Sequence, residues 1–381
     1  MSSSENFLVV DGLYKRYKDI DALREVSFQV RQGEFFVIIG PSGSGKTTLL
    51  NCLAGLLFPD KGRILLGGED ITYLPPHKRG MSMIFQDFAL FPHMTVAENI
   101  AFGLKLKGLK KDDIETEVKA ALKMIGLSGY ENRLPRQLSA GEKQRVAIAR
   151  SLVVRPKVLL FDEPLANLDY RMQRRMEEEL KVLHRKLGMT FIYVTHNQEQ
   201  AMSLADRILV LNKGFVEQIG PPDEIYNRPL NLFVARFVGD LNVIRGKLVK
   251  REDNYAYVET AYGLFRGMCW DSCEIGADVA YSVRPERIRI MAPQSIAGRD
   301  EFNAIRVKLL THIYKGAYIE LVGLTGDNIT LTARVDAKDS SLSGLQRGAE
   351  LILYWGAEEA FVLSSTSKVG GLDIESVIYG G

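Results

Sequence analysis

The sequence predicts an α/β domain followed by a small all-β domain, and three observations support this prediction. Short apolar runs suited to buried strands alternate with helical patterns as far as about Gly239. A glycine-rich segment stands between one of these runs and a helical pattern. Beyond Gly239, β-branched residues, glycines and short alternating segments dominate. We therefore expect domains at residues 1–238 and 239–381, with the boundary between Asn227 and Gly239.

The composition is that of a soluble globular protein long enough to bury a core, with 381 residues, 46% hydrophobic and 25% charged. The formal net charge of +2 indicates no polyanionic partner. Three cysteines are too few for a disulfide framework and suit a reducing compartment. Of these, Cys269 and Cys273 could form a metal or redox pair, but we expect ordinary side chains. Neither a signal peptide nor an apolar run of roughly 18 residues is present, so we expect a cytoplasmic protein.

The elements of the first domain follow from hydrophobic periodicity. Runs that are apolar throughout and too short for a helix suit buried parallel strands, whereas longer amphipathic or charged stretches suit helices. The expected strands are Phe7–Val10, Val26–Val30, Glu34–Gly40, Val158–Phe161, Thr190–Val194 and Ile208–Val210. The expected helical segments are Thr47–Ala54, Val96–Gly126, Gly141–Leu152 and Arg171–Leu187.

Short alternating segments with regular turn signals predict a small β-barrel for the second domain. No internal repeat or low-complexity tract interrupts it. The expected strands are Val243–Val249, Tyr255–Val258, Val279–Val283, Ile305–Leu310, Ile319–Val322, Ile329–Val335 and Leu351–Trp355.

The glycine-rich segment Gly40–Thr47 fits the pattern G-x-x-x-x-G-K-[ST] at every fixed position. It lies between an expected strand and an expected helix, which is the context of a P-loop that binds phosphate. Lys46 would reach the β- and γ-phosphates, and Thr47 would hold Mg²⁺. The alternative is a glycine-rich turn without a ligand. The residues expected to bind nucleotide here are Ser42, Gly43, Ser44, Gly45, Lys46, Thr47 and Thr48.

Two acids follow the apolar run Val158–Phe161 directly. After a P-loop, an acid at the end of a second buried strand can orient the magnesium shell, and we expect Asp162 to do so through water. Glu163 would polarise the water that attacks the γ-phosphate. The alternative is a pair of acids that merely begin a helix.

A third segment, Leu138-Ser139-Ala140-Gly141-Glu142, precedes Lys143–Arg150. It resembles the signature of the nucleotide-binding subunits of ABC transporters, LSGGQ followed by QRVAIAR. Further matches follow in the order of that family over about residues 7–238. Gln86 matches the Q-loop and a metal contact, Asp169 the D-loop, His196 the switch histidine that senses the γ-phosphate, and Tyr17 the aromatic that stacks on adenine. The resemblance implies a helical subdomain at about residues 87–155.

The same resemblance implies that Ser139 and the Gly141 amide bind the γ-phosphate held by a second copy of the chain. Ser139-x-x-Glu142 is also a capping box, and both interpretations are compatible. The chain departs from the family at Ala140, which a negative φ would accommodate, and at Glu142, which would bring a negative charge near the phosphates. Asn197 and the two residues after it are expected to begin a helix rather than to catalyse.

Because a separate helical subdomain cannot easily reach the P-loop of its own chain, we expect a head-to-tail homodimer with two ATP molecules between the copies. Hydrolysis would then release the dimer, a ligand-driven shift between open and closed forms. By resemblance, two membrane permease subunits would dock near Phe88–His93, and an extracytoplasmic solute-binding protein would act through them. Core of the helical subdomain is the alternative for this apolar segment.

The second domain resembles the transport-associated OB (TOBE) domain of importers for sugars, polyamines, ferric iron and related solutes. Val283-Arg284-Pro285-Glu286 and Leu353–Leu363 carry this match. OB folds often bind nucleic acid, but Lys and Arg do not cluster here, so we expect no nucleic-acid partner. We expect Trp355 to belong to the core of the domain, and the domain itself to serve as a regulatory or dimer contact.

The resemblance implies an ATPase at the cytoplasmic face of the membrane that powers solute import, with ATP and Mg²⁺ as cofactors. His77–Gly80 and Phe88–His93 look most like the polyamine branch, for spermidine or putrescine. Ferric iron, a sugar, glycerol phosphate or a phosphonate are alternative solutes, since the membrane and receptor subunits choose the solute. A soluble ABC ATPase or a nucleic-acid-binding regulator are alternatives of another class.

Overall fold

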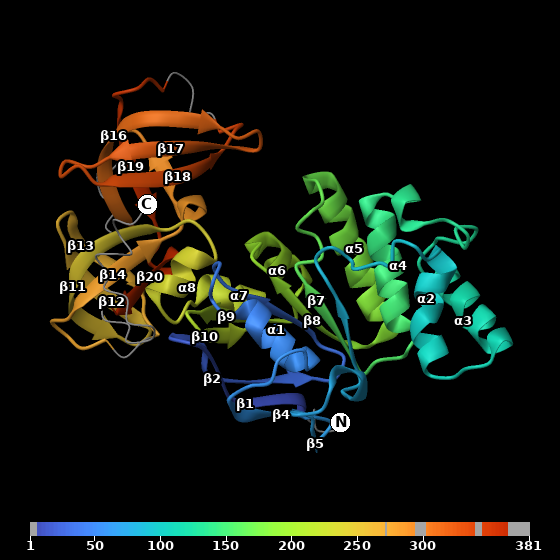
Figure 1. The fold of residues 1–381 in the computed structure, drawn as a ribbon. Helices are drawn as coiled ribbons and strands as arrows, with labels where there is room; N and C mark the ends of the chain where they lie inside the picture. Colours follow the sequence, from blue (N-terminus) through green and yellow to red (C-terminus); the bar gives the residue numbers. More distant parts are fainter. Residues whose placement is uncertain (1–5, 271–272, 294–301, 340–344, 365–381) are drawn as a thin grey trace. The chain divides into compact units, whose positions relative to one another are not determined.

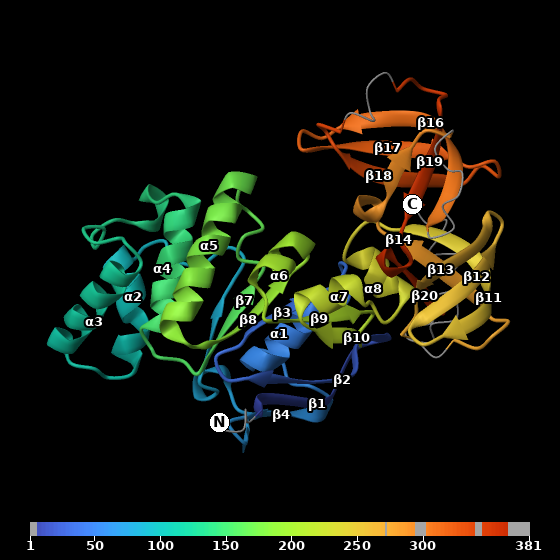
Figure 2. The ribbon, with the colours of Figure 1, turned by 180° about the vertical axis from the view of Figure 1, so that it is seen from behind.

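The structure is a computed structural model that describes residues 6–270, 273–293, 302–339 and 345–364. The chain forms two compact units, Met1–Pro222 and Asp223–Gly381, each with its own core (Figures 1 and 2). Within the described residues, no helix combines the length and the apolar character needed to cross a membrane.

A six-stranded sheet, in the order β10-β9-β3-β8-β7-β6, forms the centre of the first unit. Its strands are parallel except β10, which pairs antiparallel with β9. Every residue of β3 and β8 is buried, because both faces of the sheet are covered, and this explains the continuous apolar runs in the sequence. The strands are β3 (Phe35–Ile39), β6 (Met81–Ile84), β7 (Val158–Asp162), β8 (Thr190–Thr195), β9 (Arg207–Asn212) and β10 (Phe215–Gly220).

A second sheet of the first unit is antiparallel, in the order β2-β1-β4-β5. Helix α1 (Lys46–Ala54) shares one apolar core with this sheet and with strands of the central sheet. The helix that begins at the P-loop is therefore held on both sides. The strands are β1 (Asn6–Tyr17), β2 (Ile20–Arg31), β4 (Lys61–Leu66) and β5 (Glu69–Asp70).

Helices α2, α3 and α4 pack together around a separate small core. The segment Val96–Gly126, expected to be helical, forms two helices, α2 and α3. Thr95 caps α2 with a capping box that Glu98 completes. Asn197 caps α6, so the prediction that this segment begins a helix is confirmed. The helices are α2 (Val96–Leu106), α3 (Lys111–Met124), α4 (Ala140–Leu152), α5 (Tyr170–Leu187) and α6 (Gln198–Leu204), with the 3₁₀ turns η1 (Pro76–Lys78) and η2 (Pro135–Gln137).

The second unit contains a closed five-stranded barrel, β11-β12-β13-β20-β14, and a five-stranded sheet, β15-β19-β16-β17-β18. The all-β prediction is confirmed, and the structure adds this second sheet to the expected barrel. One core serves both, and Trp355 lies fully buried within it, donating from Nε1 to the Tyr281 hydroxyl (2.8 Å). The strands are β11 (Asn242–Glu252), β12 (Tyr255–Thr260), β13 (Gly263–Met268), β14 (Asp278–Val283), β15 (Arg289–Met291), β16 (Asn303–Tyr314), β17 (Tyr318–Leu324), β18 (Thr330–Asp336), β19 (Glu350–Trp355) and β20 (Ala360–Ser364).

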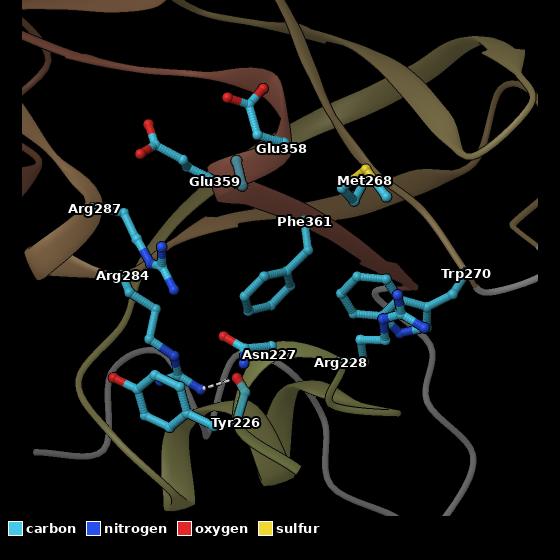
Figure 3. A pocket seen from close by; sticks show the side chains of 11 residues that line it. Tyr226, Asn227, Arg228, Met268, Trp270, Arg284, Arg287, Glu358, Glu359 and Phe361 are labelled. Carbon is cyan, nitrogen blue, oxygen red and sulfur yellow. Dashed lines mark hydrogen bonds between the residues drawn. The ribbon is translucent and has the colours of Figure 1, made fainter. Parts of the chain in front are cut away.

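Two short helices, α7 (Pro222–Asn227) and α8 (Leu232–Phe237), are tied to the barrel by one arginine. Arg284 follows β14 and is 3% exposed. Its guanidinium donates to the backbone carbonyl of Tyr226 (2.9 Å) and lies 3.9 Å from the Tyr226 ring centroid (Figure 3). It also donates to the carbonyls of Ala235 (3.1 Å) and Asp240 (3.2 Å). Burial lowers the pKa of this group.

These bonds explain why the compact units divide at the start of α7, between Pro222 and Asp223, rather than after α8, where the composition changes. A compact unit is defined by contacts within the structure, whereas a family domain is defined by sequence similarity. The predicted domain limits, 1–238 and 239–381, therefore remain a prediction.

Candidate nucleotide-binding site

The P-loop connects β3 to α1, and its glycines are required by close backbone contacts. Gly45 stands at the N-cap of α1 with φ +105°, and a Cβ there would lie 2.4 Å from the carbonyl oxygen of Ala22. A Cβ on Gly40 would lie 2.1 Å from the carbonyl oxygen of Leu211. Only glycine accommodates these positions, so the loop can follow a ligand with its backbone N–H groups.

Lys46 is 6% exposed and donates from Nζ to the carbonyls of Gly40 (2.8 Å) and Pro41 (3.0 Å). Burial lowers the pKa of this ammonium, while the nearby Glu163 and Asp162 carboxylates oppose the shift. The hydroxyl oxygen of Ser44 is buried with no hydrogen-bond partner among the described residues. A buried cation and an unpaired hydroxyl at a helix N-terminus are the groups that a phosphate would satisfy.

A cavity of about 400 Å³ opens on this loop. Gly43, Lys46 and Thr47 line it together with Tyr17 from the end of β1, whose side chain is 46% exposed. The structure therefore brings the predicted adenine-stacking residue to the same cavity as the predicted phosphate-binding loop. A nucleotide of ordinary size suits a cavity of this volume.

Asp162 and Glu163 lie where β7 ends, and His196 follows the end of the neighbouring strand β8. Nδ1 of His196 lies 2.9 Å from Oε2 of Glu163. The Glu163 backbone has φ +45°, an uncommon conformation for a side chain other than glycine, and its N–H donates to the carbonyl of Val194 (3.0 Å). Burial, and then the Glu163 charge, raise the pKa of Asp162, which Lys46 opposes. Glu163 and His196, which were predicted from separate segments of the sequence, thus form one hydrogen-bonded pair.

The predicted capping box at the start of α4 is confirmed. Ser139 is the N-cap, and its hydroxyl accepts from the Glu142 N–H (3.4 Å). Oε2 of Glu142 accepts from the backbone N–H (2.7 Å) and the hydroxyl (2.8 Å) of Ser139, and these bonds lower the pKa of Glu142. Ala140 has no positive φ, so the helix accommodates it. Neither Ser139 nor Gly141 lines the cavity at the P-loop of this chain.

Gln86 and Asp169 also lie outside that cavity. Gln86 is exposed in the loop that follows β6, and Asp169 caps α5 by accepting from the Met172 N–H (3.0 Å). Neither position excludes the predicted role, since both residues belong to loops at the carboxyl ends of strands of the central sheet.

Much of the apolar segment Phe88–His93 is packed inside the first unit. Phe88 is 6% exposed, Leu90 packs against the core of the helical part, and the Phe91 and Phe102 ring centroids are 4.6 Å apart. Core packing therefore accounts for these three side chains, while Ala89, Pro92 and His93 remain exposed.

An exposed apolar surface formed by Phe58 and Tyr73 was not predicted. Phe58 is 46% and Tyr73 66% exposed, with ring centroids 6.0 Å apart. In the sequence, two loops carry apolar residues beside proline, and these mark the surface: Leu56–Pro59 and Tyr73–Pro76. A groove of about 170 Å³ adjoins them, lined by Ala54, Leu56, Pro76, Met81, Ser82, Met83, Phe85 and Leu160.

A buried arginine at the far end of α1 was also missed. Arg79 is 1% exposed, and its guanidinium donates to the carbonyls of Cys52 (2.6 Å) and Leu53 (3.1 Å) in the last turn of α1. It also donates to the carbonyls of Leu74 (2.7 Å) and Thr72 (2.6 Å). A cation there is favourable for the helix dipole, so Arg79 fixes the end of the helix whose start forms the P-loop.

Comparison with protein-family models gives two matches. The model described as ABC transporter matches residues 23–166. The model described as TOBE domain matches residues 281–363. The first match includes the P-loop, the signature segment and both acids at the end of β7.

Curated relatives resemble the chain over most of its length. A spermidine/putrescine import ATP-binding protein PotA of Oleidesulfovibrio alaskensis is 42% identical over 84% of this chain and 86% of its own length. Its namesake from Hahella chejuensis is 44% identical over 84% of this chain and 87% of its own length. Among solved structures, cbiO1 from Clostridium perfringens, part of the ABC transporter complex cbiONQ, is 34% identical with a TM-score of 0.54, covering 58% of this chain and 90% of that one.

Proposed function

The chain belongs to the ATP-binding subunits of ABC importers that carry a C-terminal TOBE domain, and from this premise we propose that it hydrolyses ATP to drive uptake of the polyamines spermidine and putrescine. The polyamine assignment is supported by the names of the two relatives described above, spermidine/putrescine import ATP-binding proteins that match 84% of this chain. The single structural observation that supports the ATPase mechanism is the pair formed by Glu163 and His196 beside the P-loop.

In the proposed mechanism, the P-loop amides and Lys46 bind the phosphates, and the aromatic face of Tyr17 receives the adenine. Glu163 holds the attacking water in line with the γ-phosphate and accepts its proton. His196 contacts the same carboxylate through Nδ1 at 2.9 Å, and so it can orient Glu163 and respond to the phosphate. The left-handed backbone of Glu163 begins directly after β7 ends, and its carboxylate contacts His196.

The residues at this site fit Mg²⁺. The candidate ligands are the hydroxyl of Thr47, the amide of Gln86 and the carboxylate of Asp162, all oxygen donors, which Mg²⁺ prefers. Within the described ranges, no cluster of three or more His, Cys, Asp or Glu side chains could hold a metal alone. Mg²⁺ bound at a nucleotide takes most of its ligands from phosphates and water. When bound, Mg²⁺ would neutralise charge on the β- and γ-phosphates.

We propose that the working form is a head-to-tail dimer of two copies. Ser139 and the Gly141 amide lie outside the P-loop cavity of their own chain, although Ser139 is exposed at the start of α4. A partner copy could place these groups against the γ-phosphate, at a helix N-terminus that favours an anion. In the single chain, the Ser139 hydroxyl donates to the Glu142 carboxylate, so in the proposed dimer it would exchange this acceptor for the γ-phosphate.

We further propose that two membrane permease subunits bind the first unit from the cytoplasmic side, and that an extracytoplasmic solute-binding protein delivers the solute to them. The exposed apolar surface around Phe58 and Tyr73, with its adjoining groove, supports a docking site that extends from the exposed part of Phe88–His93. An amphipathic helix of the permease would suit such a groove.

Reconstitution tests the proposed function. The chain would be co-purified with the permeases encoded beside it, placed in proteoliposomes and supplied with their solute-binding protein. We expect uptake of radiolabelled spermidine or putrescine that requires MgATP on the side of this chain and is lost in Lys46→Ala. ATP-dependent uptake of ferric iron or a sugar instead would overturn the polyamine assignment and leave the importer assignment intact.

A further inference from the structure

The loop after Gln86 contains two consecutive residues in the left-handed region. Phe88 has φ +64° and Ala89 has φ +43°. Neither is glycine, asparagine or aspartate, the residues that adopt this conformation readily. Backbone in this conformation persists only when its surroundings enforce it, and such positions concentrate at functional sites and switches.

Arg150 provides the enforcing contact. It lies in the last turn of α4 and donates from Nη1 to the carbonyl of Ala89 (2.7 Å) and from Nη2 to the carbonyl of Phe88 (3.0 Å). Its guanidinium lies 5.4 Å from the centroid of the Phe91 ring. Both carbonyls of the strained pair are thus held by one planar group, which fixes their mutual orientation.

No carboxylate competes for this guanidinium. Among the described residues Arg150 forms no ion pair, whereas Arg145, on the same helix, pairs with Glu179 (3.0 Å). Burial lowers the pKa of Arg150. The guanidinium is partly buried and has no carboxylate partner among the described residues, so the two backbone carbonyls are its hydrogen-bond partners.

Helix α4 makes this contact a connection between two parts of the site. The helix spans thirteen residues, Ala140–Leu152, with Ser139 capping one end and Arg150 near the other. We propose that Arg150 is a positioning residue that locks the Phe88–Ala89 turn to α4, so that movement of the signature end of α4 is passed to Gln86. The inference rests on the proposed function, because Ser139 is taken to meet nucleotide on a second copy and Gln86 to act at the metal and attacking water.

The test uses the full-length chain and three variants, Arg150→Met, Arg150→Lys and Ala89→Gly, with the double variant Arg150→Met/Ala89→Gly. Methionine keeps the apolar stem of the arginine and removes both hydrogen bonds. We expect the KM for ATP to change less than twofold and kcat to fall about tenfold, which corresponds to roughly 1.4 kcal/mol in the barrier. Lysine, a single-point donor, should give an intermediate kcat.

The double variant Arg150→Met/Ala89→Gly distinguishes a positioning role of Arg150 from a general contribution to stability. Glycine adopts the left-handed conformation without strain, and Ala89 is exposed, so Ala89→Gly removes no buried contact. If Arg150 serves to hold the turn, kcat should fall less on losing Arg150 in the Ala89→Gly background than in the wild-type background. Arg155→Met is the control, because Arg155 is an exposed neighbour that pairs with Glu117 (2.6 Å), and its kcat should match wild type.

Two outcomes would overturn the inference. The first is a lowered melting temperature for Arg150→Met with unchanged kcat at temperatures where the variant is folded. The second is an equal loss of kcat in both backgrounds. If the wild-type chain itself hydrolyses no ATP, the proposed function fails instead, so the two failures are distinguishable. If Arg150→Met does not fold, the same comparison is made with Arg150→Lys, whose kcat is measured in the wild-type and Ala89→Gly backgrounds.

Discussion

Glu163 has the most constrained geometry in the candidate site. Its backbone is left-handed, its N–H bonds to Val194, and its carboxylate contacts His196. A residue held in a rare conformation by its neighbours is pre-organised, because little must move when substrate binds.

Glu163→Gln should therefore leave ATP binding intact while ATP turnover falls by roughly 10²–10⁴-fold, the usual contribution of a general base. The variant should form a stable dimer with MgATP, measured by sedimentation velocity. Glu178→Gln, an exposed carboxylate on α5, serves as the matched control and should hydrolyse ATP normally. Normal steady-state turnover in Glu163→Gln would contradict the assignment of the base.

Asp162 gives a pH-dependent prediction. Its pKa is raised by burial and by the Glu163 charge, so the folded chain binds this proton more readily than the unfolded chain does. The contribution of the group to stability is therefore full below its ordinary pKa and is lost as the pH rises through the raised value.

Asp162→Asn should accordingly raise the melting temperature of the nucleotide-free protein at pH 7, and the gain should shrink as the pH falls toward 4. Thermal melts across this pH range measure it. A gain that stays constant down to pH 4 would show that the carboxyl charge is not its source.

The sequence predicts residues of a continuous motif far better than it predicts side chains that donate hydrogen bonds to backbone carbonyls elsewhere in the chain. The loop around Ser42–Thr48 could be placed between a strand and a helix because this pattern is contained in one continuous stretch of sequence. Arg79, Arg150 and Arg284 could not, because each donates to backbone carbonyls that any sequence supplies. Their partners become visible only once the chain has folded.

At the scale of elements, buried strands were predicted best. In β3 and β8 every side chain is buried, so the apolar signal is continuous. Strand β13 escaped detection because two of its residues, Gly263 and Gly267, contribute no side chain to an alternating pattern. Helices α7 and α8 are too short for periodicity to reveal, and contacts with the barrel stabilise them instead.

Arg284→Met should destabilise the second unit by roughly 3 kcal/mol, because hydrogen bonds from a buried charged group to three carbonyls are lost. Trp270 reports the change, since its Nε1 donates to the carbonyl of Pro229 between α7 and α8 (2.9 Å). Urea denaturation followed by tryptophan fluorescence measures it. Arg284 and the exposed Arg287 both line a cavity of about 300 Å³ in the second unit. Arg287→Met should cost less than about 1 kcal/mol.

At the scale of the whole molecule, the two units have separate cores, and both tryptophans, Trp270 and Trp355, belong to the second. The division into an α/β part and an all-β part could be predicted from the change in composition. The exposed surface around Phe58 was harder to predict: the two loops carry apolar residues beside proline, but an apolar residue in a loop gives the same signal whether it is buried or left in water.

This separation yields a prediction for ligand binding. MgATP should raise the melting temperature of the calorimetric transition of the first unit, because a ligand stabilises the state that binds it. The transition followed by tryptophan fluorescence should not move. Lys46→Ala, which loses the buried ammonium of the P-loop, should abolish the calorimetric shift. An equal rise in both transitions would mean that the units unfold as one.

The arginine at the end of α1 has a consequence for sequence variation. Gly55 follows that helix with φ +78°, and a Cβ at this position would lie 2.4 Å from Nε of Arg79. A larger residue at position 55 would displace the guanidinium and leave the carbonyls of Cys52 and Leu53 without their donor. Positions 55 and 79 are therefore expected to co-evolve, and mutational libraries should sample the two together.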